Sequence, residues 1–154
     1  MQRCNKIYNH PIYQKHIAHI AEMERDRKFC IHDLEHSLDV ARIGWIMILE
    51  KGLDIDKELF YTAALLHDAG RYKGLPHNES GAMLACKLMP QCGFSDEETE
   101  LVTSAIREHR IDENSSDFSR ILYTADKRSR MCFNCAASAE CYWETEKRNS
   151  KIEV

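Results

Sequence analysis

The chain has 154 residues, of which 44% are hydrophobic and 30% are charged, and its formal net charge is −4. This balance is typical of one folded domain, excludes a wholly disordered chain, and argues against a protein that binds nucleic acid along its whole surface. Eight His and seven Cys residues are many for this length, and both residue types are common metal ligands.

Neither the beginning of the sequence nor its longest apolar stretch looks like a targeting or membrane segment. The first residues are charged and rich in His, unlike a signal peptide. The stretch from Leu38 to Leu49 is shorter than the roughly 20 residues that a membrane helix needs. We therefore expect a cytoplasmic protein with no membrane contact. In the cytoplasm, an odd number of closely spaced Cys residues indicates metal binding before disulfide formation.

Apolar residues recur at helical spacing along almost the whole chain, and no alternating strand pattern is present. Capping and breaking residues then predict where the helices begin and end. The first helix begins at Pro11, the second spans 33–50 before Gly52, and the third spans 56–69 before Gly70. The fourth spans 77–88 and stops at Pro90, the fifth runs from the Ser95/Glu98 capping box to about 109, and the sixth begins at Asp117. The expected fold is an all-α, single-domain bundle of about six helices.

Two His and two Asp residues lie on these otherwise apolar helices: His36, His67, Asp68 and Asp126. An Asp among apolar residues is unfavourable unless it is paired, hydrogen-bonded or bound to a cation. Imidazole and carboxylate together suit divalent iron, manganese, cobalt, nickel or zinc, so these four residues are candidate ligands of one metal ion. A lone His is more often a surface or satisfied core residue. We give that interpretation to His10, His16, His19 and His32.

The ordered set His36, His67–Asp68 and Asp126, with ALLHDAGR around the doublet and ADK around the last Asp, resembles the HD superfamily of metal-dependent phosphohydrolases. The resemblance covers about residues 30–130. It implies one helical HD domain over residues 1–154, with a Cys-rich C-terminal segment at 131–145. By the same resemblance, the four residues hold the first metal.

Members of this superfamily with two metals carry two further His residues between the doublet and the last Asp. His77 and His109 stand in those places, so the resemblance implies that they hold a second metal and that Asp68 bridges the two. The arrangement is similar to that of the bacterial dinucleoside tetraphosphate hydrolases and the HD-GYP cyclic dinucleotide phosphodiesterases. The GYP signature is absent here.

Basic residues follow several of the proposed ligands. Arg71 and Lys127 are the favoured contacts for a phosphoryl group, because positive charge stabilises the charge that develops on its oxygens. Asp68 completes the candidate catalytic set. Weaker candidates for phosphate binding are Lys73, Arg110 and Arg130. The alternative is that these are solvated residues at helix ends. Similarly, Asp39 either orients an imidazole or is an ordinary surface acid.

The resemblance implies a hydrolase that cleaves a phosphate ester or anhydride in a small phosphorylated substrate, a nucleotide being favoured, by metal-activated hydroxide. One alternative is a mixed-valent diiron oxygenase on the same scaffold. Another is a non-enzymatic metal-sensing or redox-sensing module that uses the Cys residues. The native metal and the oligomeric state are left open.

The Cys residues near the end of the chain form a second motif, C-x2-C-x5-C, made by Cys132, Cys135 and Cys141. Three thiolates invite a fourth ligand for zinc or an iron–sulfur cluster. Cys30, six positions before His36, is the first candidate and Cys4 is the second. We expect Cys92 and Cys86 to stay outside this group, Cys86 as a small core residue. The alternative is a set of unbound thiols in a mobile tail.

Overall fold

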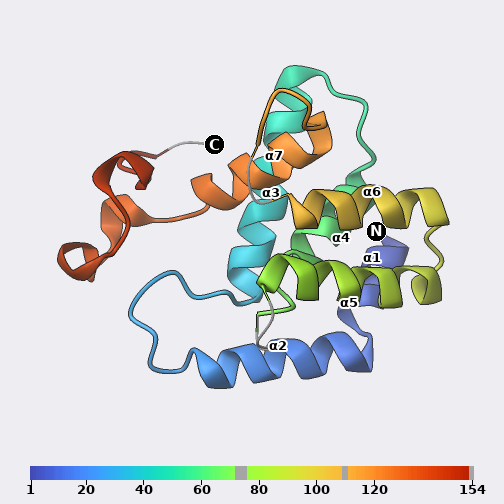
Figure 1. Cartoon of the computed structure of the whole chain (residues 1–154), viewed down its shortest axis with the longest axis horizontal. Helices are drawn as coiled ribbons and strands as arrows, with labels where there is room; N and C mark the ends of the chain where they lie inside the picture. Colours follow the sequence, from blue (N-terminus) through green and yellow to red (C-terminus); the bar gives the residue numbers. More distant parts are fainter. Residues whose placement is uncertain (72–75, 109–110, 153–154) are drawn as a thin grey trace.

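The computed structural model describes residues 1–71, 76–108 and 111–152. Within these ranges the protein has α-helices, short 3-10 helices and no strand, which confirms the all-α prediction (Figure 1). None of the described helices is long and apolar enough to cross a membrane. The elements are α1 (Gln2–Tyr8), α2 (Pro11–Met23), α3 (Leu34–Lys51), α4 (Lys57–Leu66), α5 (His77–Cys92), α6 (Asp96–Arg107), α7 (Asp117–Arg128), η1 (Cys132–Asn134), η2 (Ser138–Glu140) and η3 (Thr145–Lys147).

Helix α3 lies at the centre of the arrangement and packs against both α4 and α7, while α5 and α6 form a closely packed pair (Figure 1). The ends of α3 lie where the capping residues predict them. Asp33 caps the first turn by accepting a hydrogen bond from the His36 amide at 2.9 Å, and Gly52 ends the helix in the left-handed conformation with φ of 62°. The cap therefore fixes the turn that carries His36.

Helix α4 runs through the interior. From Leu59 to Leu66 every residue except Tyr61 is buried, and Phe60 packs edge-on against Phe118 of α7 at 5.5 Å between ring centroids. Complete burial of side chains of this size contributes about 1.5–3 kcal/mol each. The polar pair His67–Asp68 follows directly after this apolar helix, so the main chain carries both side chains into the core.

Three expectations about the helical part of the chain were wrong. Helix α1 was missed, because it is short and polar and is held by tertiary contacts, among them the Arg3–Glu58 ion pair at 3.0 Å. Helix α5 continues through Pro90 to Cys92, since only the last turn loses a hydrogen bond there and Met89 and Cys92 are buried. Cys86 is exposed on α5.

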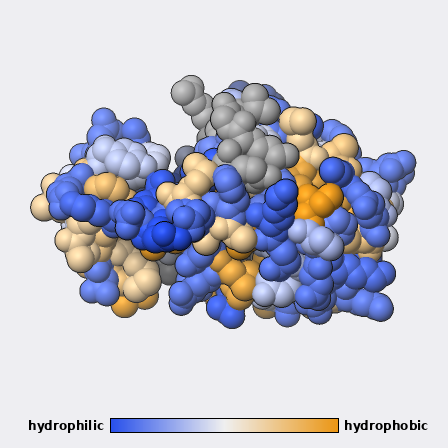
Figure 2. Space-filling view, turned by 90° about the horizontal axis from the view of Figure 1, so that it is seen from below, coloured by the Kyte–Doolittle hydropathy of each residue, from blue (hydrophilic) through white to orange (hydrophobic). Residues whose placement is uncertain are grey.

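The segment after α7 extends away from the helices as a separate lobe, at the left of Figures 1 and 2. It consists of η1, η2 and η3 joined by turns, and none of its described residues, 131–152, is buried. We call this segment the tail. Because it has no apolar interior, other interactions must hold it in place.

The turn that carries Asp68 packs backbone to backbone against the start of α5. A Cβ atom on Gly70 would lie 2.3 Å from the Gly81 amide nitrogen and 2.5 Å from the Ser80 Cβ atom. Such distances are impossible for real atoms, and neither neighbour is the flexible end of a side chain. Gly70 is therefore required by the close approach of the two chain segments.

We predict that Gly70→Ala destabilises the protein by about 3 kcal/mol or more, because α5 must move to admit the methyl group. Gly52→Ala is the matched control: its φ is left-handed, but nothing lies within 4 Å of the added Cβ. It should cost about 1 kcal/mol. Urea denaturation of both variants measures the difference, and equal costs would contradict the packing described.

Candidate metal centre

The structure brings together the four residues proposed as ligands of the first metal. The ligand atoms of His36, His67, Asp68 and Asp126 all lie within 4.8 Å of one another, and no other group of three or more His, Cys, Asp or Glu side chains among the described residues does so. Asp68 Oδ2 lies 3.1 Å from His67 Nε2 and 3.4 Å from His36 Nε2. Asp126 Oδ1 lies 3.5 Å from His36 Nε2. The residues come from α3, the turn after α4, and α7.

Three atoms of this cluster are buried without a hydrogen bond: His36 Nε2, His67 Nε2 and Asp68 Oδ2. Each buried polar atom left in this state costs about 1–3 kcal/mol. Because the three atoms face one another, a single cation between them satisfies all three. Two imidazole nitrogens and two carboxylates form a donor set that suits a divalent transition metal. The residues present therefore fit a metal ion.

Neighbouring groups set the tautomers of both His ligands. His67 Nδ1 lies 2.8 Å from the Ala64 carbonyl oxygen, which can only accept, so Nδ1 carries the proton. Ser129 Oγ donates to the Asp126 carbonyl at 2.8 Å and lies 3.2 Å from His36 Nδ1, so it accepts from that nitrogen. In its neutral form, each ring therefore directs an Nε2 lone pair at the cluster.

Ser129 is a positioning residue that sequence reasoning missed. The candidate for that role was Asp39, whose carboxylate instead lies 3.6 Å from Arg42 on the half-exposed face of α3. A Ser three residues after an Asp in the last turn of a helix carries no distinctive sequence signal. Only the crossing of α3 and α7 places it beside His36.

The electrostatics of the cluster show how strongly it attracts positive charge. Burial opposes ionisation of Asp68, but the positive charge of His67 and the nearby His36 and Arg71 hold its pKa well below the usual range. Burial also disfavours protonation of His67, yet the negative charges of Asp68 and Asp126 raise its pKa to about 9. A metal ion that binds here must displace this proton.

The second oxygen of Asp68 faces the other side of the site. Asp68 Oδ1 lies 2.8 Å from Arg71 Nε, an ion pair without the geometry of a hydrogen bond, and 3.9 Å from His77 Nε2 at the start of α5. One oxygen thus faces His36 and His67 while the other faces His77. This is the arrangement that a bridging carboxylate needs. His109, the other proposed ligand of a second metal, lies outside the described residues.

Two further His residues support the cluster. His16 of α2 is buried, as expected for a satisfied core residue, and its Nδ1 atom lies 2.9 Å from the Ala69 carbonyl. His32 is also buried, with Nδ1 at 2.7 Å from Glu24 Oε1. Its Nε2 atom, however, lies 3.9 Å from Asp68 Oδ2, closer to the site than the sequence indicated. The sequence signal that could have placed His32 near the site is its spacing of four residues from His36.

The cluster opens into a cavity of about 740 Å³. Arg71, Lys127 and Arg130 line it, together with the aromatic residues Tyr123 and Trp143. Lys127 is ion-paired with Asp126 and lies 4.8 Å over the Tyr123 ring, while Arg130 lies 4.6 Å over the Trp143 ring. Lys73 and Arg110, the other weaker phosphate candidates, fall outside the described residues.

The four Cys residues proposed as a second site line one cavity of about 480 Å³: Cys30, Cys132, Cys135 and Cys141. Burial raises the pKa of Cys30, nearby Arg130 lowers it, and the neighbouring Cys132 and Cys141 raise it further. No three of the four sulfur atoms lie within 4.8 Å of one another. The residues therefore share a cavity without forming a closed ligand set.

The sequence matches the HD domain family over residues 33–131, and the chain belongs to this family. A crystal structure described as a predicted HD superfamily hydrolase from an uncultured Thermotogales bacterium is similar, with a TM-score of 0.63, 28% identity, and coverage of 89% of this chain and 81% of that one. The fold and the His/Asp cluster thus belong to a class of metal-binding hydrolases.

An uncharacterized protein of Clostridium beijerinckii is 40% identical over 156 residues, which cover 99% of each chain. A bifunctional uridylyltransferase/uridylyl-removing enzyme of Cereibacter sphaeroides is 32% identical over 109 residues, which are 68% of this chain but only 10% of that enzyme. An enzyme of the same description from Gluconobacter oxydans is 42% identical over 55 residues, or 36% of this chain and 6% of that enzyme.

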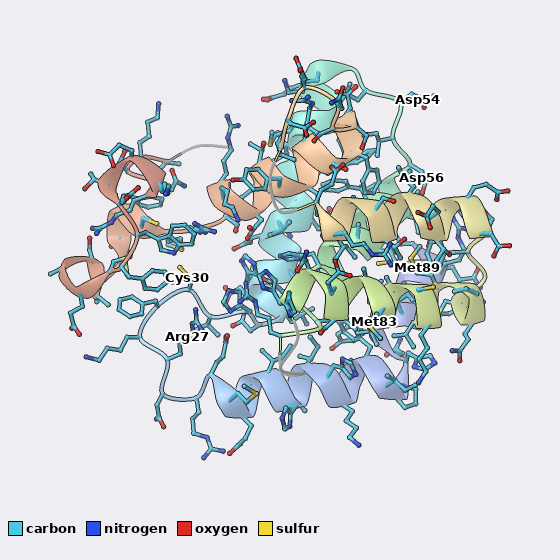
Figure 3. The ribbon with its side chains drawn as sticks, in the orientation of Figure 1. Arg27, Cys30, Asp54, Asp56, Met83 and Met89 are labelled. Carbon is cyan, nitrogen blue, oxygen red and sulfur yellow. The ribbon has the colours of Figure 1, made fainter. Side chains whose placement is uncertain are left out.

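We predict that Asp68→Ala abolishes binding of both metals, because the shared carboxylate is lost, whereas His77→Ala lowers the metal content by about one equivalent. Asp54→Ala, on the exposed loop between α3 and α4 (Figure 3), should keep the full content. Elemental analysis after loading with manganese or iron measures all three. Full metal content in Asp68→Ala would show that this carboxylate is not a ligand.

Proposed function

We propose that this protein hydrolyses a phosphate ester or anhydride bond in a small phosphorylated substrate, with a nucleotide as the favoured substrate class. The observation that carries the proposal is the buried set of unsatisfied His and Asp ligand atoms beside a cavity lined by four basic side chains, Arg71, Lys127, Arg130 and Lys147. Phosphoryl hydrolysis needs both parts: a nucleophile available at neutral pH and positive charge for the phosphoryl oxygens.

A divalent metal bound at the His/Asp cluster would lower the pKa of a bound water to about 7, which supplies the nucleophile. The protein residues supply the rest. Ser129 and the Ala64 carbonyl keep the two imidazoles oriented, and Asp68 presents its two oxygens to the two sides of the site. These contacts hold the reacting groups in place before the substrate arrives.

The basic side chains bind and neutralise the phosphoryl group in this proposal. In the structure, Arg71 is paired with Asp68, and Lys127 with Asp126. With a cation held by His36, His67, Asp68 and Asp126, the two carboxylates would no longer need Arg71 and Lys127, and these side chains would be released to turn their donors to phosphoryl oxygens. The stacking of Lys127 on Tyr123 keeps its amine at the cavity wall.

The cavity also suits the rest of a nucleotide. Its volume of about 740 Å³ falls within the roughly 300–1,000 Å³ of small-molecule sites. Tyr123 and Trp143 offer aromatic faces on which a base could stack. Relatives whose names describe the removal of a uridylyl group, which is a nucleotide, support the same class. We expect no nucleic-acid polymer as substrate, because the net charge is −4.

We predict that Lys127→Met lowers turnover about 100-fold while the metal content is unchanged, because one positive charge on the phosphoryl group is lost. Lys87→Met, exposed on α5, is the control and should keep full activity. The assay is phosphate release, or nucleotide product formation, from a panel of phosphorylated metabolites with iron-, manganese- and cobalt-loaded protein.

Unchanged turnover in Lys127→Met would remove this residue from the mechanism. Metal-dependent oxygen uptake with no hydrolysis of any phosphorylated compound would instead favour the diiron oxygenase alternative.

A further inference from the structure

The tail is ordered although it has no hydrophobic core of its own. Arg148 donates hydrogen bonds to the carbonyl oxygens of Ser138, Cys141 and Trp143 at 2.7–3.0 Å, but none of the described residues of the tail, 131–152, is buried. Its ties to the segment before α3 are an exposed Lys28–Glu140 ion pair at 2.8 Å and an edge-on contact of Phe29 with Tyr142. Such surface contacts contribute little, and small segments without a core are usually held by disulfides or metal.

The Cys residues lie where such a link would act. Cys132 begins η1, and the Cys135 amide donates back to the Cys132 carbonyl at 3.3 Å, so the two lie on one tight turn. Cys141 directly follows η2. Cys30 lies between α2 and α3, and Figure 3 shows it on the side of this segment that faces the tail. All four line the cavity of about 480 Å³ between the tail and the helices.

The remaining Cys residues do not belong to this cavity. Cys4 is buried in α1, where the side chain of Thr62 lies beside it, and Cys92 is buried at the end of α5. Cys86 is exposed on α5. Four of the seven Cys residues therefore line this cavity. Four is the number of ligands in a tetrahedrally coordinated zinc site.

We propose that Cys30, Cys132, Cys135 and Cys141 bind one zinc ion as four thiolates, and that this site fastens the tail to the helices. Binding draws the sulfur atoms together until each lies about 2.3 Å from the ion. The protons of the thiols pass to solvent as the thiolates form. Zinc binding itself does not rest on the hydrolytic function proposed above, because none of the four ligands belongs to the His/Asp cluster.

The link has a consequence for the active-site cavity. Four residues line both cavities: Arg71, Asp126, Arg130 and Trp143. Trp143 lies two residues after Cys141 and stacks on Arg130, so an ion that fixes Cys141 also fixes this wall. The zinc site is thus a positioning device for the substrate cavity.

The test uses the full chain in an Asp68→Ala background, where the His/Asp cluster no longer binds metal. Zinc content should be about one equivalent per chain, and replacement of zinc by cobalt should give the near-ultraviolet sulfur-to-cobalt charge-transfer band that only thiolate ligands produce. Cys135→Ser should lose both, and Cys86→Ser, the matched control, should keep both. Helical circular dichroism then shows whether α1 to α7 remain folded.

Equal zinc content with and without Cys135→Ser would overturn the proposal. An iron–sulfur absorption spectrum in place of zinc would also overturn it. If Cys135→Ser loses its helical signal, thiol titration of the parent protein decides: four thiols must resist modification until a chelator is added, and their immediate reaction contradicts the site.

The positioning role has its own readout. In a Trp45→Phe background, which leaves Trp143 as the one Trp of the chain, removal of zinc should shift the fluorescence to longer wavelength and increase quenching by acrylamide. Unchanged emission would show that the ion does not hold Trp143, whether or not the protein hydrolyses phosphate esters.

Discussion

A carboxylate buried among helices governs this structure. Asp68 follows the apolar helix α4, is almost fully buried, and keeps one oxygen without a hydrogen bond while two imidazole nitrogens face it. An isolated charge in such a place is strongly unfavourable. The cost is acceptable only because positive charge gathers around it: Arg71 on one side, and on the other a protonated His67 or a metal ion. The same concentration of negative charge and lone pairs makes the site a metal-binding site.

The helices around Asp68 keep it where it is. The glycine contact between Gly70 and Gly81 allows the turn to touch α5, and His16 holds the Ala69 carbonyl from α2. Helices α3 and α7 then bring His36 and Asp126 from opposite ends of the sequence to the same carboxylate. A rigid apolar bundle thus pre-organises a polar centre, at the cost of stability at that centre.

The sequence predicted much of the fold, because the helices are marked by strong caps and apolar periods, as at Asp33, Gly52 and the Ser95 capping box. It predicted the four clustered ligands because a carboxylate on an apolar helix needs a cation or another partner, and because the order of the four residues is specific to one family. It missed helix α1, which is held by contacts far along the chain: Cys4 and Ile7 are buried in the core, and Arg3 is paired with Glu58. It also missed Ser129 and the position of His32, because these depend on how helices cross rather than on any local pattern. Whether the Cys residues bind an ion depends on closure of a cavity, which periodicity does not report.

The central claim is that water activated at the His/Asp cluster attacks phosphorus. The most direct test uses a substrate that the metal-loaded protein cleaves. The reaction is run in oxygen-18 water, with and without dioxygen. The account predicts that the phosphoryl product carries one solvent oxygen atom and that the rate is the same without dioxygen. A product free of solvent oxygen, formed only when dioxygen is present, would contradict it.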